Sequence, residues 1–229
     1  WRQLWGIGDF PFNFVQIAPY QYNEDVRILP KFWVAQSASL SIPNTGMVVT
    51  TDIGTLADIH PRNKQEVGRR LALLALAKTY GKKDLVCDGP AFKSMAIEGS
   101  KVKLSFDNAE GLKSRDGKPL SWFEMVGEDT DFVKADAVIE GQSIVLSSPQ
   151  VAKPVAVRFS WHRDAEPNLV NGAGLPAAAF SSGGIPYADS LARIPEAKDY
   201  ELAYALDLSK LGRDIAYDTD NSAKLGEFD

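Results

Sequence analysis

GMVVTTDIGTLADIHPRNKQEVGRRLALLALAKTY, residues 46–80, carries a strand signal, a loop and a helix signal in succession. The first six residues are mostly apolar or β-branched, which indicates a buried strand. From Lys64 to Tyr80 apolar residues recur along one helical stripe: Val67, Leu71, Leu74 and Leu76. The loop between them holds Asp58 and His60, and α/β proteins place active groups in such loops.

The residues upstream repeat the alternation of strand and helix signals. FNFVQIAP at residues 12–19 is a short β-type run closed by a proline, and a helical pattern follows from Arg27 to Ser41. Pro30 suits the first turn of that helix, where a missing N–H is tolerated. The order strand–helix–strand–helix predicts an α/β region over residues 1–82, with a parallel sheet covered by helices.

Residues 83–182 change to short runs of alternating polar and apolar residues, separated by turn signals such as Asp-Gly at 116–117 and Glu-Gly at 140–141. The runs lie at residues 92–97, 101–106, 135–139, 143–146 and 155–161. This pattern predicts an antiparallel β-sandwich. Residues 183–229 form a third, partial C-terminal piece with a strand expected over 200–208, and it is too short to hold its own core.

Composition limits the class of function. The apolar fraction of 45% and charged fraction of 24% are those of a globular protein. The net charge of −5, with scattered basic residues, argues against a nucleic-acid partner. No apolar run reaches the roughly 20 residues that a membrane helix needs, so we expect no membrane association.

The few cysteines and histidines also limit the chemistry. One cysteine, Cys87, excludes an intrachain disulfide and a cysteine-rich zinc site. It lies in a strand-like stretch at residues 84–87, where a buried packing role is expected. The two histidines, His60 and His162, are far apart in sequence, so we expect no metal site and no cofactor. His162 follows a strand, and we interpret it as a surface-loop residue.

His60 is the candidate catalytic residue. A histidine accepts a proton near neutral pH, and a carboxylate at its other ring nitrogen fixes the tautomer and stabilises the imidazolium. Asp58, two residues earlier in the loop, can fill that role. The alternative is that His60 caps the following helix or fills a polar notch. Arg69 and Arg70 on that helix are expected to lie on its solvated face.

Three stretches of the sequence strengthen the interpretation of His60 as a catalytic residue. They are TDIG, DIHPRNKQ and VGRRLA within residues 51–72, FPFNFVQIAPY at 10–20, and VRFSW at 157–161 with NL at 168–169 and GLPA at 174–177. Together they resemble the sialate O-acetylesterase family of the SGNH (GDSL-like) hydrolases, over about residues 1–182. The resemblance implies that residues 1–82 are the C-terminal half of a flavodoxin-like SGNH hydrolase sheet, followed by the β-sandwich.

The resemblance also implies a carbohydrate O-acetylesterase with a Ser-His-Asp mechanism. A serine attacks the acetyl carbonyl, His60 takes and returns the proton, and an aspartate orients His60. The superfamily has its acid three residues before the histidine. This sequence departs from that pattern, because it has Ala57 at that position. Asp58, two residues before His60, is the acid that the resemblance favours. Asp52 is its rival, with a turn cap at Gly54 as its alternative role.

The family's nucleophile and oxyanion blocks, of Gly-Gln-Ser-Asn and Gln-Gly-Glu-Ser-Asn type, have no counterpart in this sequence. We therefore expect the N-terminal half of the same protein, as upstream sequence or a second chain, to supply the serine. The chain alone is expected to be inactive. Acetylated sialic acid and acetylated xylan are both candidate substrates, and their location favours a secreted or periplasmic protein. A non-catalytic carbohydrate-binding accessory fragment is the alternative, in which exposed tryptophans contact sugar.

Overall fold

The computed structural model describes residues 2–22, 25–128 and 130–182. These residues belong to one unit that spans Trp1–Gly184. The third piece predicted at 183–229, including the strand expected over 200–208, lies outside the described residues. Among the residues that the structure describes, no helix is long and apolar enough to span a membrane.

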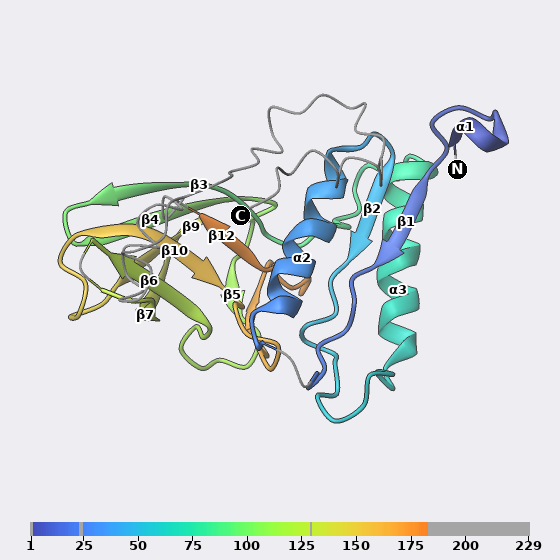
Figure 1. Ribbon diagram of the computed structural model, residues 1–229. Coiled ribbons are helices and arrows are strands. Elements are labelled where there is room, and N and C mark those ends of the chain that lie inside the picture. Colours follow the sequence, from blue (N-terminus) through green and yellow to red (C-terminus); the bar gives the residue numbers. More distant parts are fainter. Residues whose placement is uncertain (1, 23–24, 129, 183–229) are drawn as a thin grey trace, which may run out of the picture. The chain divides into compact units, whose positions relative to one another are not determined.

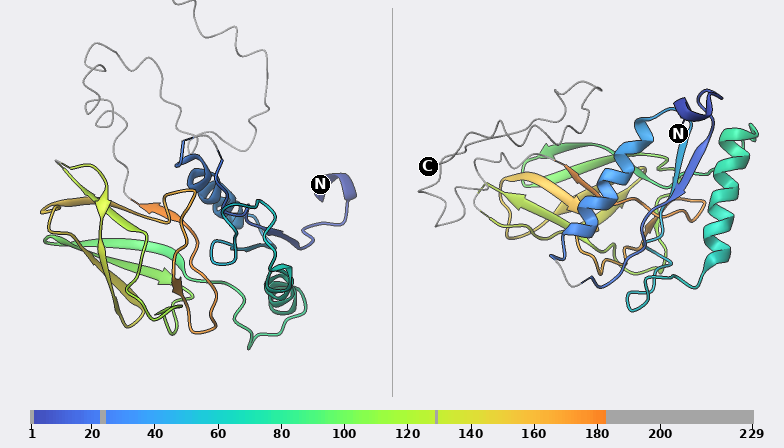
Figure 2. Two further views of the ribbon diagram at one scale, coloured as in Figure 1. Left: turned by 90° about the horizontal axis from the view of Figure 1, so that it is seen from below. Right: turned by 45° about the vertical axis from the view of Figure 1, so that its right-hand side comes forward.

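The first part of the unit is a parallel pair of strands between helices (Figure 1). Strand β1 (Phe12–Val15) pairs in parallel with β2 (Thr45–Val48). Helix α2 (Ile28–Ala38), extended by the 3₁₀ turn η1 (Ser39–Ser41), lies on one side, and α3 (Lys64–Leu74) lies on the other (Figure 2). A π-helical turn, η2 (Ala75–Thr79), continues α3, and a short helix α1 (Arg2–Trp5) precedes β1.

The second part consists of antiparallel sheets. One four-stranded sheet has the order β3-β4-β9-β8, and the other has the order β12-β10-β6-β7. A two-stranded sheet joins β11 to β5. The strands are β3 (Ala91–Glu98), β4 (Lys101–Asp107), β5 (Lys113–Ser114), β6 (Phe123–Gly127), β7 (Val133–Lys134), β8 (Asp136–Glu140), β9 (Ser143–Ser147), β10 (Pro154–Phe159), β11 (Leu169–Val170) and β12 (Phe180–Ser182).

The two four-stranded sheets bury one common apolar core. Alternating residues of β4 and β9 pack with residues of β6 and β10, as period-two burial requires. In β4, for example, Val102, Leu104 and Phe106 are buried while their neighbours are not. The core includes Ile144 and Leu146 from β9, Phe123 and Met125 from β6, and Val157 and Phe159 from β10.

The helices and mixed sheets agree with the predicted α/β class. The two helical patterns and the five alternating runs are confirmed as helices and strands. The strand expected around Cys87 is wrong: the chain turns there, with the N–H of Leu85 donating to the carbonyl of Lys82 (3.2 Å), and no strand covers residues 84–87. Cys87 is half-buried, and desolvation together with Asp88 raises the pKa of its thiol to about 11.

The apolar stripe predicted for the second helix is only partly correct. Leu74 is fully buried, but Leu76 is 39% exposed. The second buried residue of α3 is Arg70, which was expected on the solvated face. Arg69 beside it is half exposed, as expected. The buried face of α3 is therefore anchored by a charge, and this charge reaches the loop that carries His60.

Candidate functional site

The loop between β2 and α3 places Asp58 directly beside His60. The Asp58 carboxylate accepts a hydrogen bond from the backbone N–H of His60 (2.9 Å), and the same oxygen lies 3.7 Å from Nδ1 of the ring. A distance of 3.7 Å is too long for a hydrogen bond. The geometry nevertheless turns Nδ1 towards the carboxylate and leaves Nε2 on the other side of the ring. The His60 side chain is 85% exposed.

A local turn fixes this arrangement. The N–H of Asp58 donates to the carbonyl of Thr55 (2.8 Å), and the two residues form an isolated antiparallel bridge. Pro61, directly after His60, is buried. Helix α3 begins at Lys64 with Asn63 as its N-cap, whose side chain accepts from the N–H of Glu66 (3.1 Å). His60 therefore does not cap the helix, and its ring is left for another role.

Asp52, the rival acid, is bound to a different partner. Nη1 of Arg70 donates to one of its carboxylate oxygens (2.7 Å) and Nη2 to the other (2.6 Å). Both side chains are only 5% exposed. Asp52 is thus half of a buried, bidentate ion pair, and its carboxylate does not cap the turn at Gly54 as predicted. The structure brings Asp58, rather than Asp52, next to His60.

The Arg70 guanidinium ties the loop to the sheet and to α3. It also donates to the carbonyl of Val49 (2.7 Å) and, through Nε, to Glu66 (2.7 Å). Burial acts to lower the pKa of Arg70, yet Asp52 and Glu66 outweigh it and raise this pKa above its usual value. The hydrogen bond from Arg69 lowers the pKa of Glu66 to about 2, against desolvation, which raises it. Glu66, Arg69 and Arg70 therefore remain charged near neutral pH.

The segment after β1 runs beside the same loop. The N–H of Gln21 donates to the carbonyl of Leu56 (3.2 Å). Gly54 faces Pro19 so closely that a Cβ would lie 2.9 Å from the proline ring. Two of the stretches singled out in the sequence, residues 10–20 and 51–72, therefore meet at the ends of β1 and β2. Buried at these strand ends, the side chains of Gln16 and Thr51 have no hydrogen-bond partner among the described residues.

The third stretch, residues 157–177, has a structural role around two asparagines. Asn168 donates to Ser114, Asp116 and the carbonyl of Pro119, and accepts from Ser121. Asn171 donates to the carbonyl of Asp88 (3.0 Å) and accepts from the N–H of Leu175 (3.0 Å). These bonds fix loops of the antiparallel region, and the N–H···O bond from Arg115 Nη1 to the carbonyl of Asp52 (3.0 Å) connects that region to the His60 loop.

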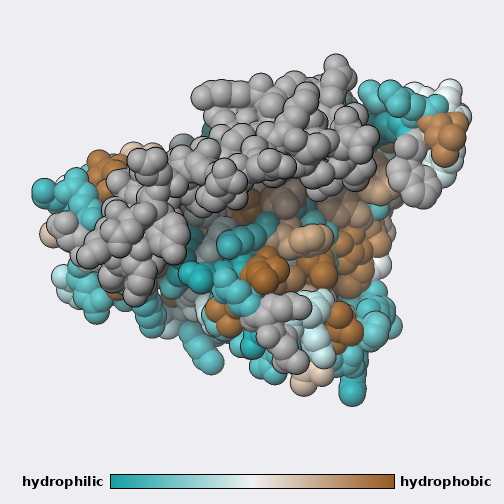
Figure 3. All heavy atoms as spheres, in the orientation of Figure 1, coloured by the Kyte–Doolittle hydropathy of each residue, from teal (hydrophilic) through white to brown (hydrophobic). Residues whose placement is uncertain are grey.

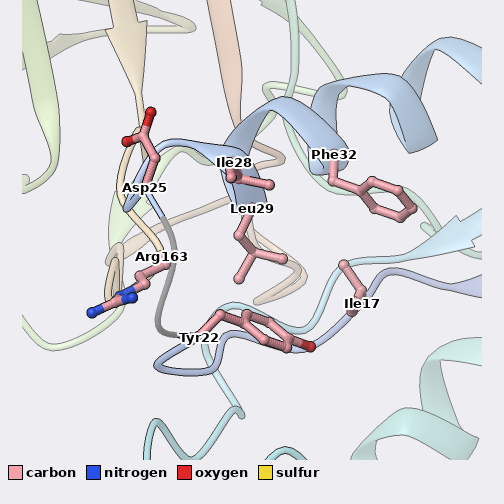
Figure 4. A pocket seen from close by; sticks show the side chains of 7 residues that line it. All are labelled: Ile17, Tyr22, Asp25, Ile28, Leu29, Phe32 and Arg163. Atoms are coloured by element: carbon pink, nitrogen blue, oxygen red, sulfur yellow. The ribbon is translucent and has the colours of Figure 1, made fainter.

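An apolar pocket of about 200 Å³ lies beside α2 (Figure 4). Leu29 and Phe32 of α2 face Ile17 and Tyr22 of the segment after β1. The charged ends of Asp25 and Arg163 point away from these apolar side chains. A hydrogen bond from Arg27 lowers the pKa of Asp25. The pocket therefore offers apolar contact but no catalytic group to a ligand.

Comparison with known proteins relates this geometry to a family. The chain is 34% identical over 183 residues to the human sialate O-acetylesterase and 32% to the rat one, and in each case 70% of the chain is matched. A solved carbohydrate acetylesterase from Xanthomonas citri superposes with a TM-score of 0.75 at 37% identity, over 80% of this chain and 43% of that one. The chain belongs to the sialate O-acetylesterase family. It spans about a third of the length of its curated relatives. No protein-family model matches it.

Membership in the sialate O-acetylesterase family confirms the resemblance drawn from the three stretches. What the sequence interpretation missed at the site is Arg70. Its position offered a signal, because residues 67, 70 and 74 share one face of a helix and Asp52 ends the preceding strand segment. The sequence also gave no indication that the side chains of Gln16 and Thr51 would be buried without a hydrogen-bond partner among the described residues.

Proposed function

We propose that this chain is part of a carbohydrate O-acetylesterase in which His60 is the general base and Asp58 orients it. The observation that carries the proposal is the loop geometry: Nδ1 of His60 lies beside the Asp58 carboxylate, and the ring is 85% exposed. With Nδ1 facing the acid, Nε2 is left to take the proton of an attacking serine and give it to the departing sugar oxygen, which leaves as a hydroxyl. The 3.7 Å separation can shorten when the imidazolium forms, because catalytic hydrogen bonds often tighten only with substrate bound.

The serine and the oxyanion hole come, in this proposal, from the N-terminal part of the same protein. Two observations support it: the chain spans about a third of the length of its relatives, and its sequence has no nucleophile block. Residues 1–82 would then complete an SGNH sheet to which β1 and β2 contribute, and residues 83–182 would form the β-sandwich domain. Gln16 and Thr51, which follow the ends of β1 and β2, have buried side chains without a partner among the described residues, and the N-terminal part would supply hydrogen-bond partners for them.

The substrate would be an acetylated carbohydrate. The names of the relatives, sialate O-acetylesterase and carbohydrate acetylesterase, support an acetyl ester of a sugar. Acetylated sialic acid is the first candidate and acetylated xylan the second, and parallel assays with both would separate them. Because such glycans lie outside cells, we propose a secreted or periplasmic location.

The test is His60→Ala in the full-length natural protein, assayed with an aryl acetate and with an acetylated sugar. Loss of the base is expected to lower kcat/KM by a factor on the order of 10³, with the fold unchanged because the side chain is exposed. Arg62→Ala, an exposed cation two residues away, is the matched control and should retain activity. Hydrolysis at near wild-type rate by the His60 variant would show that another residue is the base.

A further inference from the structure

A second site lies on the antiparallel region, at the end of the β6–β10 pair. A pocket of about 410 Å³ is lined by two tryptophans and a histidine, together with charged and hydroxyl side chains. The aromatic residues of its lining include Trp122, Trp161 and His162, and the charged ones include Glu124, Arg158 and Lys134. Its volume lies within the usual range for ligand pockets, roughly 300–1,000 Å³, and its mixture of aromatic and polar groups is that of a binding site.

Two residues beside the pocket have a left-handed backbone conformation. Trp122, directly before β6, has φ 65°, and Ser160, directly after β10, has φ 56°. The N–H of Ser160 donates to the carbonyl of Trp122 (2.9 Å), so these two left-handed residues are bonded to each other. Non-glycine residues pay a conformational cost in this region and cluster where function needs it. The result is a Trp122 side chain that is 36% exposed although it adjoins the core strand β6.

The aromatic rings form an ordered surface. The rings of Trp122 and His162 stack with centroids 6.0 Å apart and an interplanar angle of 27°. Nδ1 of His162 accepts a hydrogen bond from the N–H of Asp164 (3.1 Å), which holds the imidazole in place. His162 stacks on one side of the Trp122 ring, and the exposed part of an indole held in this way can contact the apolar C–H face of a sugar ring.

The polar groups of the pocket are held just as firmly. Arg158 donates to both oxygens of Glu124 (2.6 and 3.2 Å) across the β6–β10 pair. Its guanidinium also lies over the Phe132 ring, 4.0 Å from the centroid. Fixed, planar charged groups at the border of an aromatic surface can donate to and accept from adjacent hydroxyls. Lys134, opposite Glu124 on β7, adds a further donor.

We propose that this pocket binds a sugar ring of the glycan, with Trp122 as the stacking residue and the Glu124–Arg158 pair as the hydroxyl-binding group. The inference goes beyond ester cleavage, because it requires no acetyl group and no catalytic serine. The ligand class is a pyranose-containing oligosaccharide. Neutral and acidic oligosaccharides share the ring face, and their relative affinities will show whether Lys134 selects a carboxylate.

The test measures binding of fully deacetylated oligosaccharides to the full-length protein by calorimetry, using neutral xylo-oligosaccharides and sialyl-oligosaccharides. Trp122→Ala is expected to weaken binding roughly tenfold, whereas Trp122→Phe retains most of it. Tyr80→Ala removes a more exposed aromatic residue (72% against 36% for Trp122) from the end of η2 and should leave the affinity unchanged. Glu124→Gln keeps the side-chain shape and does not alter Trp122. It should also weaken binding, which tests the site even if Trp122→Ala disturbs the local fold.

Hydrolysis of an aryl acetate, which has no sugar, is measured in parallel. Trp122→Ala should leave that rate unchanged, so a failure of the binding proposal is distinguishable from a failure of the esterase proposal. Absence of binding to every oligosaccharide would overturn the inference. So would an affinity that neither the Trp122 nor the Glu124 substitution alters.

Discussion

At the residue scale, Arg70 is the side chain on which the candidate site depends structurally. Its neighbour Arg69 makes an exposed ion pair with Glu66, whereas Arg70 makes a buried one with Asp52. A buried charge is stabilised only by its partner, because desolvation costs several kcal/mol per ion. Two adjacent arginines on one helix therefore have very different energetic roles, and the chain offers a direct comparison between them.

We expect Arg70→Met to lower the free energy of unfolding by about 3–5 kcal/mol, because it leaves the Asp52 carboxylate buried without a partner. Arg69→Met removes only an exposed pair and should cost about 1 kcal/mol or less. Urea denaturation of both variants measures the difference. Similar losses in the two variants would contradict the assignment of Arg70 as the buried partner.

The contrast between these arginines shows which features of the site could be predicted from the sequence and which could not. The sequence predicted the strand, the loop and the helix around His60, because apolar periodicity is local. It also predicted that Asp58 lies beside His60, because the two residues are only two positions apart in one loop. It did not predict the Asp52–Arg70 pair, because 18 residues separate the partners and only the packing of α3 on the sheet brings them together.

At the element scale, the packing of α3 on β2 depends on a residue with no side chain. A Cβ at Gly46 would lie 2.5 Å from Oδ1 of Asn13 and 3.2 Å from Leu74. Asn13 is the cross-strand partner of Gly46, and Leu74 is the buried leucine of α3. The glycine therefore lets helix and strands approach closely, which is one of the positional roles of glycine in strands.

Gly46→Val tests this contact. Valine favours strands, so propensity alone predicts stabilisation, but overpacking against Leu74 should instead lower the free energy of unfolding by about 1–3 kcal/mol. Gly68→Ala, inside α3 with open space around its Cα, should raise it by about 0.5–1 kcal/mol. Urea denaturation compares the two. Stabilisation by valine would mean that α3 does not pack here.

The antiparallel elements show which strands sequence can predict. Strands β3, β4, β8, β9 and β10, with five or more residues, coincide with the runs predicted from period-two alternation, whereas β6, also five residues long, was not predicted. The strands β5, β7 and β11 have two residues each, which is too short for a period of two to be recognised in the sequence. Their positions are set by the partners they pair with, which lie far away in sequence.

At the scale of the whole molecule, the β1–β2 pair is a very small sheet that leaves apolar side chains exposed. Two parallel strands seldom stand alone, and parallel sheets are normally covered on both faces. Here Phe12 and Val15 of β1 and Phe32 of α2 are exposed, and apolar side chains gather over α2 and the strands beside it (Figure 3). A hollow of about 330 Å³, lined partly by Phe12, Phe14 and Phe32, lies between these elements.

The proposed N-terminal part of the esterase would cover this surface and bring the serine to His60. We therefore expect the 229-residue chain alone to bind the apolar dye ANS and to show no aryl acetate hydrolysis, whereas the full-length protein hydrolyses the ester and binds little dye.

Phe12→Ser should reduce dye binding by the chain alone. Val138→Ser, at an apolar residue of β8 that is more exposed than Phe12 (59% against 47%), should not. Hydrolysis by the chain alone would show that it contains its own nucleophile, and equal effects of the two serine substitutions would show that β1 is not the surface that the N-terminal part covers.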